Sequence, residues 1–319
     1  MKVVIIGGTG HIGTYLVPRL VNAGHETIVV SRNKKHPYLP HSSWNSVRHV
    51  EMDRVEMEKD NLFATQILTL APDVVIDLIC YTPESARNLV EVFQGKIAHL
   101  ISCGTIWVHG YSEQVPTKET QPRNPFCQYG KNKAACEEYL LSVSRDTGFP
   151  VTILHPGHLV GQGWKPLNPA GNFNLVTFKR IARGEEVILP NLGLETVHHV
   201  HADDVAQSFI KAMDNRSKAI GESFHIVSEQ ALTLRGYAIA MAAWFGQKPL
   251  LKFLPWESWK NTVEKDDANA TWDHIAHSPN CSIAKAQKLL HYSPRYSSLE
   301  SIYESIQYLI DNNQLDITN

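Results

Sequence analysis

Tyr129 and Lys133 stand four residues apart near the start of a segment, Cys127 to Arg145, that has the spacing of a long helix. On a helix this spacing puts the phenol and the ammonium on one face. A phenol is a poor base at neutral pH because its ordinary pKa is about 10, and a fixed cation beside it favours the phenolate. The pair could therefore exchange a proton with a hydroxyl or a carbonyl oxygen.

A glycine-rich turn directly after the apolar run Lys2 to Ile6 predicts phosphate binding. Its glycines allow a tight turn and let the N–H groups of the following helix approach a pyrophosphate, so we expect a dinucleotide there. The alternative is an ordinary glycine-rich turn. The cofactor-binding residues expected from this turn are Gly7, Thr9, Gly10, His11, Ile12 and Gly13.

The sequence after the second strand bears on which dinucleotide binds. NAD-selective domains usually offer Asp or Glu to the ribose hydroxyls at this point, whereas this chain reads Val30-Ser31-Arg32-Asn33. Arg32 could bind a 2′-phosphate, so the sequence favours NADP and leaves NAD open. Arg32 also fits a solvated strand end. Asp53, just past the third strand, is expected near the adenine, although an acidic turn residue needs no ligand.

The elements that position these residues follow from alternating patterns. Short β-branched runs alternate with segments of helical spacing, which predicts repeated β-α-β units and hence an α/β fold with a doubly wound parallel (Rossmann) sheet. The expected strands are 2–6, 26–30, 47–51, 73–78, 97–102 and 151–154, and the expected helices are 12–23, 83–93 and 127–145.

After Pro156 the sequence becomes rich in Gly, Pro and Asn. A helix (173–183), a strand (197–200), a helix (203–213) and a strand (223–227) are expected next, followed by helices over 232–245, 282–290 and 297–311. We therefore predict a Rossmann domain of residues 1–165 and 196–229. A smaller, mostly helical substrate-binding domain would comprise residues 166–195 and 230–319.

Composition limits the partners. The chain has 30 Lys and Arg against 32 Asp and Glu, so its charge gives no reason to expect nucleic acid. The five cysteines are widely spaced, which disfavours a disulfide framework and a zinc site. The sequence shows no signal peptide or apolar run of membrane-spanning length, so we predict a cytoplasmic protein without a membrane partner.

Four segments, in order along nearly the whole chain, resemble the extended short-chain dehydrogenase/reductase family, also called the NAD-dependent epimerase/dehydratase family. They are Leu100 to Gly110 followed by Tyr129 and Lys133, Leu154 to Gly161, His201 to Ala206, and Ser282 to Pro294. The resemblance implies that Thr105, Tyr129 and Lys133 are catalytic. Thr105 would polarise the substrate oxygen, Tyr129 would exchange its proton, and Lys133 would lower the Tyr129 pKa and hold the nicotinamide ribose. Leu78, Pro156 and His158 are also expected along the cofactor.

The sequence departs from the family at sites that concern the substrate. His155 replaces the usual Arg, no Arg lies in the segment before His201, and none occurs between Arg235 and Arg295. These absences weaken the expectation of a nucleoside-diphosphate sugar. Dehydratases of the family carry an Asp-Glu pair after the catalytic Thr, but Ile106 and Trp107 follow here, which disfavours dehydration.

Two further groups of residues, histidines and tryptophans, could bind a metal or a ligand. Histidines invite a metal hypothesis, but no carboxylate or Cys lies at ligand spacing, so we predict no metal site; they are His198, His199, His201, His274 and His277. The last two would share a helical face that could line the substrate cleft. Trp256, Trp259 and Trp272 could stack on a sugar-like ligand, although packing within the protein explains them better.

The sequence therefore predicts an NAD(P)-dependent epimerase or reductase. It would transfer hydride between the nicotinamide and a secondary alcohol or ketone carbon of a sugar-like small molecule, and the sequence does not separate epimerisation from net reduction or oxidation. The alternative is a non-catalytic NAD(P)-sensing regulator or an RNA-binding relative on the same fold. A homodimer could form through the helix of residues 127–145, whose apolar residues also suit sheet packing.

Overall fold

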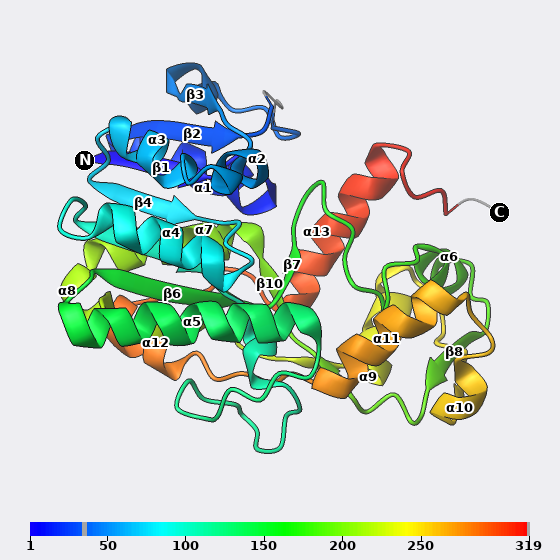
Figure 1. Ribbon diagram of the computed structural model, residues 1–319. Helices are drawn as coiled ribbons and strands as arrows, with labels where there is room; N and C mark the ends of the chain where they lie inside the picture. Colours follow the sequence, from blue (N-terminus) through cyan, green and yellow to red (C-terminus); the bar gives the residue numbers. More distant parts are fainter. Residues whose placement is uncertain (34–36, 318–319) are drawn as a thin grey trace.

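A seven-stranded sheet forms the larger part of the computed structural model, which describes residues 1–33 and 37–317. The order β11-β6-β5-β4-β1-β2-β3 reverses at β1, and every neighbouring pair is parallel, so the predicted doubly wound α/β sheet is confirmed (Figure 1). The strands are β1 (Lys2–Ile6), β2 (Glu26–Ser31), β3 (Arg48–Glu51), β4 (Val74–Asp77), β5 (His99–Cys103), β6 (Val151–Pro156) and β11 (Ser223–Ile226).

Helices cover both faces of the sheet because its strands are apolar on both sides. Val3 and Ile5 of β1 belong to one core, and Val4 and Ile6 to the other. The first core includes α1 (His11–Asn22) and α7 (Ala202–Asp214), and the second includes α3 (Phe63–Thr69), α4 (Pro83–Phe93) and α5 (Gln128–Thr147). The short helices α2 (Arg54–Lys59) and α3 were not predicted.

The C-terminal lobe has a core of its own, centred on Phe178, Leu189, Tyr237, Trp259 and Ile306. The strands of the sheet point toward this lobe in Figure 1, with α13 between the two parts. Its elements are α6 (Val176–Ala182), β8 (Val187–Pro190), α9 (Leu234–Trp244), β13 (Leu251–Leu254), α10 (Trp256–Trp259), α11 (Lys265–His277) and α13 (Ser298–Asp311). The parallel pair of β8 with β13 and the helix α10 were not predicted, whereas α11 contains the helical face expected for His274 and His277.

Short elements connect the two parts of the molecule. The strand β7 pairs with β10, and β9 pairs with β12. These strands are β7 (His158–Val160), β9 (Thr196–Val197), β10 (His199–His201) and β12 (Leu232–Thr233). The other elements of the described residues are the helices α8 (Arg216–Ala219) and α12 (Ala284–Leu290) and the 3₁₀ turns η1 (Ser42–Ser46) and η2 (Ile106–His109).

The helix α12 corrects one part of the predicted domain division. The sequence assigns it to the C-terminal domain, but Ala286 and Leu290 lie in the core of the sheet together with α7. The Lys285 ammonium donates to the carbonyl of Ser223 in β11 at 2.8 Å, and the Tyr292 hydroxyl donates to that of Val227 at 3.1 Å. Local sequence did not reveal this packing because the partners are distant along the chain. The other domain boundaries stay predictions.

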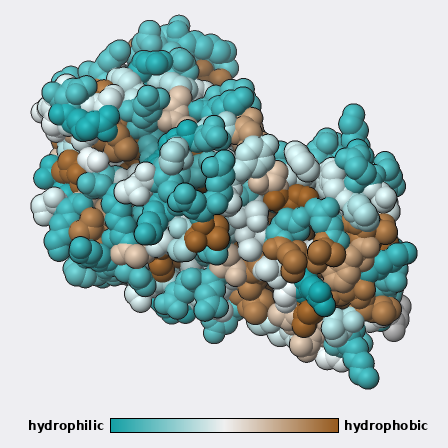
Figure 2. Space-filling model, turned by 90° about the horizontal axis from the view of Figure 1, so that it is seen from below, coloured by the Kyte–Doolittle hydropathy of each residue, from teal (hydrophilic) through white to brown (hydrophobic). Residues whose placement is uncertain are grey.

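The surface differs between the two parts. Figure 2 shows apolar surface gathered on the C-terminal lobe, at the right of the view, and mainly polar surface on the sheet domain. Large exposed apolar side chains of the lobe include Leu192, Leu194, Ile239, Leu250 and Trp272. Among the residues that the structure describes, no helix has the length and apolar character needed to cross a membrane.

Candidate functional site

The glycine turn between β1 and α1 combines tight packing with an open face. A Cβ on Gly7 would lie 2.7 Å from Cγ2 of Ile79, and one on Gly13 would lie 1.9 Å from the carbonyl oxygen of Gly8. Gly10 is freer, since its Cβ would meet only the Gly7 carbonyl oxygen at 3.4 Å. No side chain caps α1, so the N–H groups and positive dipole end of its first turn can receive an anion.

A cavity of about 570 Å³ adjoins this turn at the carboxyl ends of the strands. Five of the predicted cofactor residues line it, namely Gly7, Thr9, Gly10, Arg32 and Asp53. Four other predicted residues are not part of its lining. Gly13 packs against the backbone of Gly8 within the turn. Ile12 and Leu78 are buried in the core, and Pro156 is the last residue of β6. The cavity therefore collects most of the predicted adenosine-side residues.

The His11 side chain points to a different surface. Its Nδ1 is hydrogen-bonded to the Tyr38 hydroxyl and its Nε2 lies 3.2 Å from the Val160 carbonyl oxygen. The ring stacks on Trp164 with 4.6 Å between centroids. Burial lowers the pKa of His11 to about 3, so the ring is neutral at pH 7. Only the backbone of His11 remains available to a phosphate.

Asp53 has a structural role in this cavity. Its carboxylate accepts hydrogen bonds from the backbone N–H groups of Val55 at 2.9 Å and Glu56 at 3.3 Å, which caps α2. The cap accounts for an acidic residue at this position without a ligand, the second of the two interpretations that the sequence left open.

The sequence interpretation missed a buried ion pair beside the same cavity. Nη1 of Arg54 donates to both carboxylate oxygens of Asp77 at 3.0 and 2.9 Å, and Nε donates to Glu58 at 2.7 Å. Arg54 is 6 % exposed and Asp77 is fully buried. Asp77 ends the apolar strand β4. A buried carboxylate requires a cation beside it, so an Asp in this apolar run was the signal in the sequence that could have indicated the ion pair.

Replacing Arg54 with Met is expected to lower the free energy of unfolding by about 3–5 kcal/mol, because it leaves the Asp77 carboxylate buried without its cation. Chemical denaturation of both proteins measures the difference. The matched control is Arg87→Met, which breaks an exposed 3.3 Å ion pair with Glu84 and should leave stability nearly unchanged. Similar small losses in both variants would contradict the proposed role of the buried pair.

Thr105, Tyr129 and Lys133 converge at the carboxyl end of β5. Thr105 precedes η2, while Tyr129 and Lys133 lie on successive turns of α5. The Thr105 side chain lies close enough to Tyr129 to lower the pKa of its phenol. The Lys133 ammonium donates to the Cys103 carbonyl at 2.7 Å and lies 6.0 Å from the centre of the Tyr129 ring. The structure thus brings the three predicted residues together.

A cavity of about 210 Å³ opens over two of these residues. Aromatic and imidazole rings form much of its wall and leave it mostly apolar, a suitable setting for a ligand with few polar contacts. Its lining comprises Thr105, Ile106, Trp107, Tyr129, Gly157, His158, Leu159, Trp164 and Phe173. The predicted residue His158 is in this set, whereas Trp107, Trp164 and Phe173 were not identified as site residues from the sequence.

The pKa of Tyr129 differs from the expected value. Burial raises the pKa of Tyr129, although 42 % of its surface is exposed, and the nearby Thr105 side chain opposes that rise without cancelling it. Lys133 was expected to lower this pKa, but its ammonium is held at the Cys103 carbonyl and lies near the ring. In the protein alone the net effect is a raised Tyr129 pKa, and a lowering by Lys133 stays a prediction.

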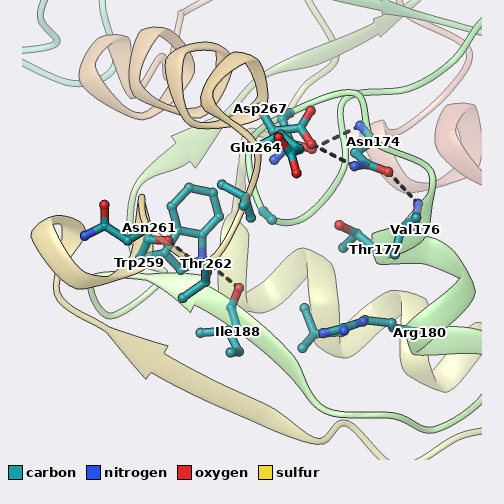
Figure 3. A pocket seen from close by; sticks show the side chains of 14 residues that line it. Asn174, Val176, Thr177, Arg180, Ile188, Trp259, Asn261, Thr262, Glu264 and Asp267 are labelled. Carbon is teal, nitrogen blue, oxygen red and sulfur yellow. Dashed lines mark hydrogen bonds between the residues drawn. The ribbon is translucent and has the colours of Figure 1, made fainter.

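A third cavity, of about 400 Å³, lies in the C-terminal lobe (Figure 3). Its wall includes Asn174, which donates to the Asp267 carboxylate at 2.7 Å, and Trp259, whose indole N–H donates to the Ile188 carbonyl at 2.8 Å. Arg180 is the one cation of the described lining, against the carboxylates of Glu264 and Asp267.

The tryptophans pack mainly against one another. The ring centroids of Trp256 and Trp259 are 5.6 Å apart, and those of Trp256 and Trp272 are 5.3 Å apart. Trp259 is 1 % exposed. These contacts agree with the packing interpretation.

Four of the five histidines considered as metal ligands form polar contacts within the protein. His198 contacts the Ser228 carbonyl at 2.9 Å, and His201 lies 2.5 Å from the Glu304 carboxylate. His274 and His277 each bond a carbonyl of their own helix, and the His277 ring stacks on Trp107 with 4.2 Å between centroids. Within residues 1–33 and 37–317, no group of three or more metal-ligating side chains could hold an ion.

Known proteins share both sequence and fold with this chain. It is 27 % identical over 319 residues to the chloroplast stem-loop binding protein of 41 kDa b from Arabidopsis thaliana, covering 95 % of this chain and 78 % of that protein. It is 24 % identical over 235 residues to 2′-dehydrokanamycin reductase from Streptomyces kanamyceticus, covering 74 % of this chain and 64 % of the reductase.

Solved structures show the same fold at lower identity. The UDP-glucose 4-epimerase of Thermotoga maritima, crystallised with UDP-glucose, is 22 % identical with a TM-score of 0.73, covering 98 % of this chain and 100 % of that chain. The UDP-glucuronic acid 4-epimerase of Bacillus cereus, in complex with UDP-glucuronic acid and NAD, is 18 % identical, also with a TM-score of 0.73 and with the same coverage of 98 % and 100 %.

A family profile decides the assignment. The profile described as "NAD dependent epimerase/dehydratase family" matches residues 3–226, which include the glycine turn, Thr105, Tyr129 and Lys133. The chain therefore belongs to the NAD dependent epimerase/dehydratase family, the extended short-chain dehydrogenase/reductase family that its sequence resembles.

Proposed function

We propose that the protein transfers hydride between the nicotinamide of NADP and a secondary alcohol or ketone carbon of a sugar-like small molecule. The observation that carries this proposal is the placement of Thr105 and Tyr129 on one cavity, with Lys133 behind them, at the sheet edge that also holds the glycine turn. The cofactor, when bound, supplies the hydride or accepts it.

Each residue then has a defined task. The Thr105 hydroxyl orients the substrate oxygen, and Tyr129 gives its proton to that oxygen or removes it. Lys133 would hold the nicotinamide ribose. The raised pKa of Tyr129 keeps its phenol protonated at neutral pH, which is the form that donates to a ketone oxygen during reduction. Epimerisation would use the same residues with hydride returned to the other face.

A substrate panel tests this function directly. Absorbance at the nicotinamide band follows NADPH oxidation with ketoses, keto-derivatives of amino sugars and UDP-hexoses as substrates. The third cavity, of about 400 Å³ in the C-terminal lobe, is proposed to hold the part of the substrate beyond the reacting ring. Because the lining of that cavity has one cation, Arg180, and two carboxylates, Glu264 and Asp267, we expect substrates without a diphosphate to react faster than UDP-hexoses. Absence of turnover with every member would contradict the proposal.

The proposal of NADP rests on Arg32, which lines the cavity at the end of β2. We expect NADPH to bind about 10–100-fold more tightly than NADH, since a charge-assisted contact to the 2′-phosphate contributes about 1.5–3 kcal/mol. Arg32→Ala should remove this preference and leave NADH affinity unchanged, as measured by cofactor fluorescence. Tighter binding of NADH to the wild type would show that NAD is the cofactor.

A second candidate function is RNA binding without turnover. It is favoured by the similarity to a protein whose name describes stem-loop binding. The near-neutral charge of the chain supports the enzyme instead. Filter binding of a stem-loop RNA at physiological salt separates the two, because saturable RNA binding in a protein without turnover would favour the second function.

We also propose a homodimer that uses α5. Ala134, Ala135 and Tyr139 are partly exposed on this helix, beside α4. Light scattering after gel filtration measures the mass, and a monomer at micromolar concentration would contradict the proposal.

A further inference from the structure

His155 stands in β6 at the position where the family resemblance predicts Arg. Its side chain is fully buried, and its Nδ1 accepts a hydrogen bond from the backbone N–H of Thr105 at 2.8 Å. An arginine guanidinium has only donors, so it could not accept from this N–H. The departure at position 155 therefore creates a contact to a proposed catalytic residue that the usual side chain could not make.

The hydrogen bond fixes the protonation of the His155 ring. A nitrogen that accepts an N–H carries no proton, so the ring is neutral and its proton is on Nε2. Nε2 lies 3.1 Å from Oε1 of Glu137, close enough for electrostatic attraction although the atoms are not aligned for a hydrogen bond. The carboxylate beside Nε2 thus favours the tautomer that leaves Nδ1 free to accept.

Glu137 is itself held in place as a carboxylate. It is 3 % exposed, and Arg123 binds both of its oxygens at 2.7 and 3.0 Å. Burial raises the pKa of Glu137, but the Nε2–H dipole of His155 and the Arg123 guanidinium outweigh burial and keep that pKa below its ordinary value. Arg123, Glu137 and His155 therefore form a chain of contacts that ends at the backbone of Thr105.

The surrounding backbone fits an imidazole at this place. A Cβ on Gly104 would lie 2.2 Å from Nδ1 of His155, so the ring fits only beside glycine. The Gly104 N–H donates to the Leu154 carbonyl at 2.7 Å, and the next N–H, that of Thr105, meets the His155 ring. The imidazole thus continues the hydrogen bonds between β5 and β6 past the last paired residues, Cys103 and Leu154.

We propose that His155 is a positioning residue, whose Nδ1 holds the Thr105 backbone so that the Thr105 hydroxyl faces Tyr129 and the substrate oxygen. This inference rests on the proposed function for its catalytic consequence. The contact itself belongs to the fold, so the two can be tested separately.

Three variants at position 155 separate the acceptor from the rest of the side chain. Asn offers a carbonyl oxygen close to the place of Nδ1, Leu offers no polar atom, and Arg offers only donors. The matched control is His99→Leu, which removes another fully buried imidazole, on β5, that contacts Thr152 and not Thr105. Thermal unfolding is recorded for every variant.

The first readout is the Thr105 amide in ¹⁵N NMR spectra and hydrogen exchange. We expect slow exchange in the wild type, His155→Asn and His99→Leu, and at least about 10-fold faster exchange in His155→Leu and His155→Arg, because the N–H then lacks its acceptor. The second readout is NADPH oxidation with cyclohexane-1,2-dione as the ketone probe. We expect kcat to fall by about 100-fold in the Leu and Arg variants, with the KM for NADPH within about twofold.

The outcomes divide clearly. A Leu variant that keeps both slow exchange of the Thr105 amide and wild-type kcat overturns the proposal. If the exchange pattern is as expected but the wild type turns over neither the probe nor the substrate panel, the positioning contact stands and the proposed function fails. Should the variants not fold, ¹⁵N spectra of the wild-type imidazole still decide, since a proton on Nδ1 of His155 would overturn the proposal.

Discussion

Replacing Tyr129 with Phe is expected to lower kcat for ketone reduction by about 10²–10⁴-fold, because the variant keeps the ring and loses the proton. The phenol is the proposed proton donor of the cavity that Thr105 shares, and the Thr105 hydroxyl alone is a much weaker acid. NADPH affinity should stay within about twofold, since the ring and Lys133 remain. Steady-state kinetics and fluorescence titration measure the two quantities.

Tyr139→Phe is the matched control for this substitution. Tyr139 lies on the same helix, and its ring packs beside Arg87 at 5.5 Å, on the side of α4. Its loss of a hydroxyl should leave kcat unchanged. If Tyr129→Phe retained the wild-type rate, Tyr129 would not be the proton donor, and retention of stem-loop RNA binding as well would favour the non-catalytic function.

Acidification is expected to destabilise the protein by several kcal/mol between pH 6.5 and 5.5. Burial lowers the pKa of His11 and His199 to about 3 and that of His198, His274 and His277 to about 4. In the unfolded chain these groups titrate near about 6.5. Below that pH the unfolded state therefore binds more protons than the folded state, and stability falls with decreasing pH.

The size of this effect follows from linkage. Each such histidine lowers the free energy of unfolding by about 1.4 kcal/mol per pH unit until the pH approaches its folded pKa. Several together approach the whole stability of an ordinary domain, about 5–15 kcal/mol. Urea unfolding at pH 7.5, 6.5 and 5.5 measures the slope, and His274→Phe should reduce it by about half a proton on average over this range. Constant stability over this range would mean that the buried rings are not neutral.

Local sequence predicted the elements whose patterns are self-contained. The inner strands of the sheet are largely apolar runs because both faces are buried, and the glycine turn is defined by its own spacing. Tyr129 and Lys133 share a helix, and Thr105 closely follows a strand at the sheet edge where ligands bind. These features needed no knowledge of distant contacts.

Features set by long-range contacts were missed. The helix α3 has seven residues and is held by the burial of Phe63, Ala64 and Ile67. The His11 ring is turned by Val160 and Trp164, far along the chain, and the partner of Arg54 is Asp77. Such pairings depend on the tertiary fold, which periodicity does not encode.

The return of the chain to the sheet at α12 has a consequence for engineering. The family match ends at residue 226, yet Leu290 and Tyr292 complete the core that packs against β11. Most of the C-terminal lobe after β11 is thus an insertion between two parts of one domain. Exchanging this part of the lobe between relatives would require two junctions, one on each side of it, whereas a chain cut after residue 229 would leave buried apolar side chains of the sheet facing water.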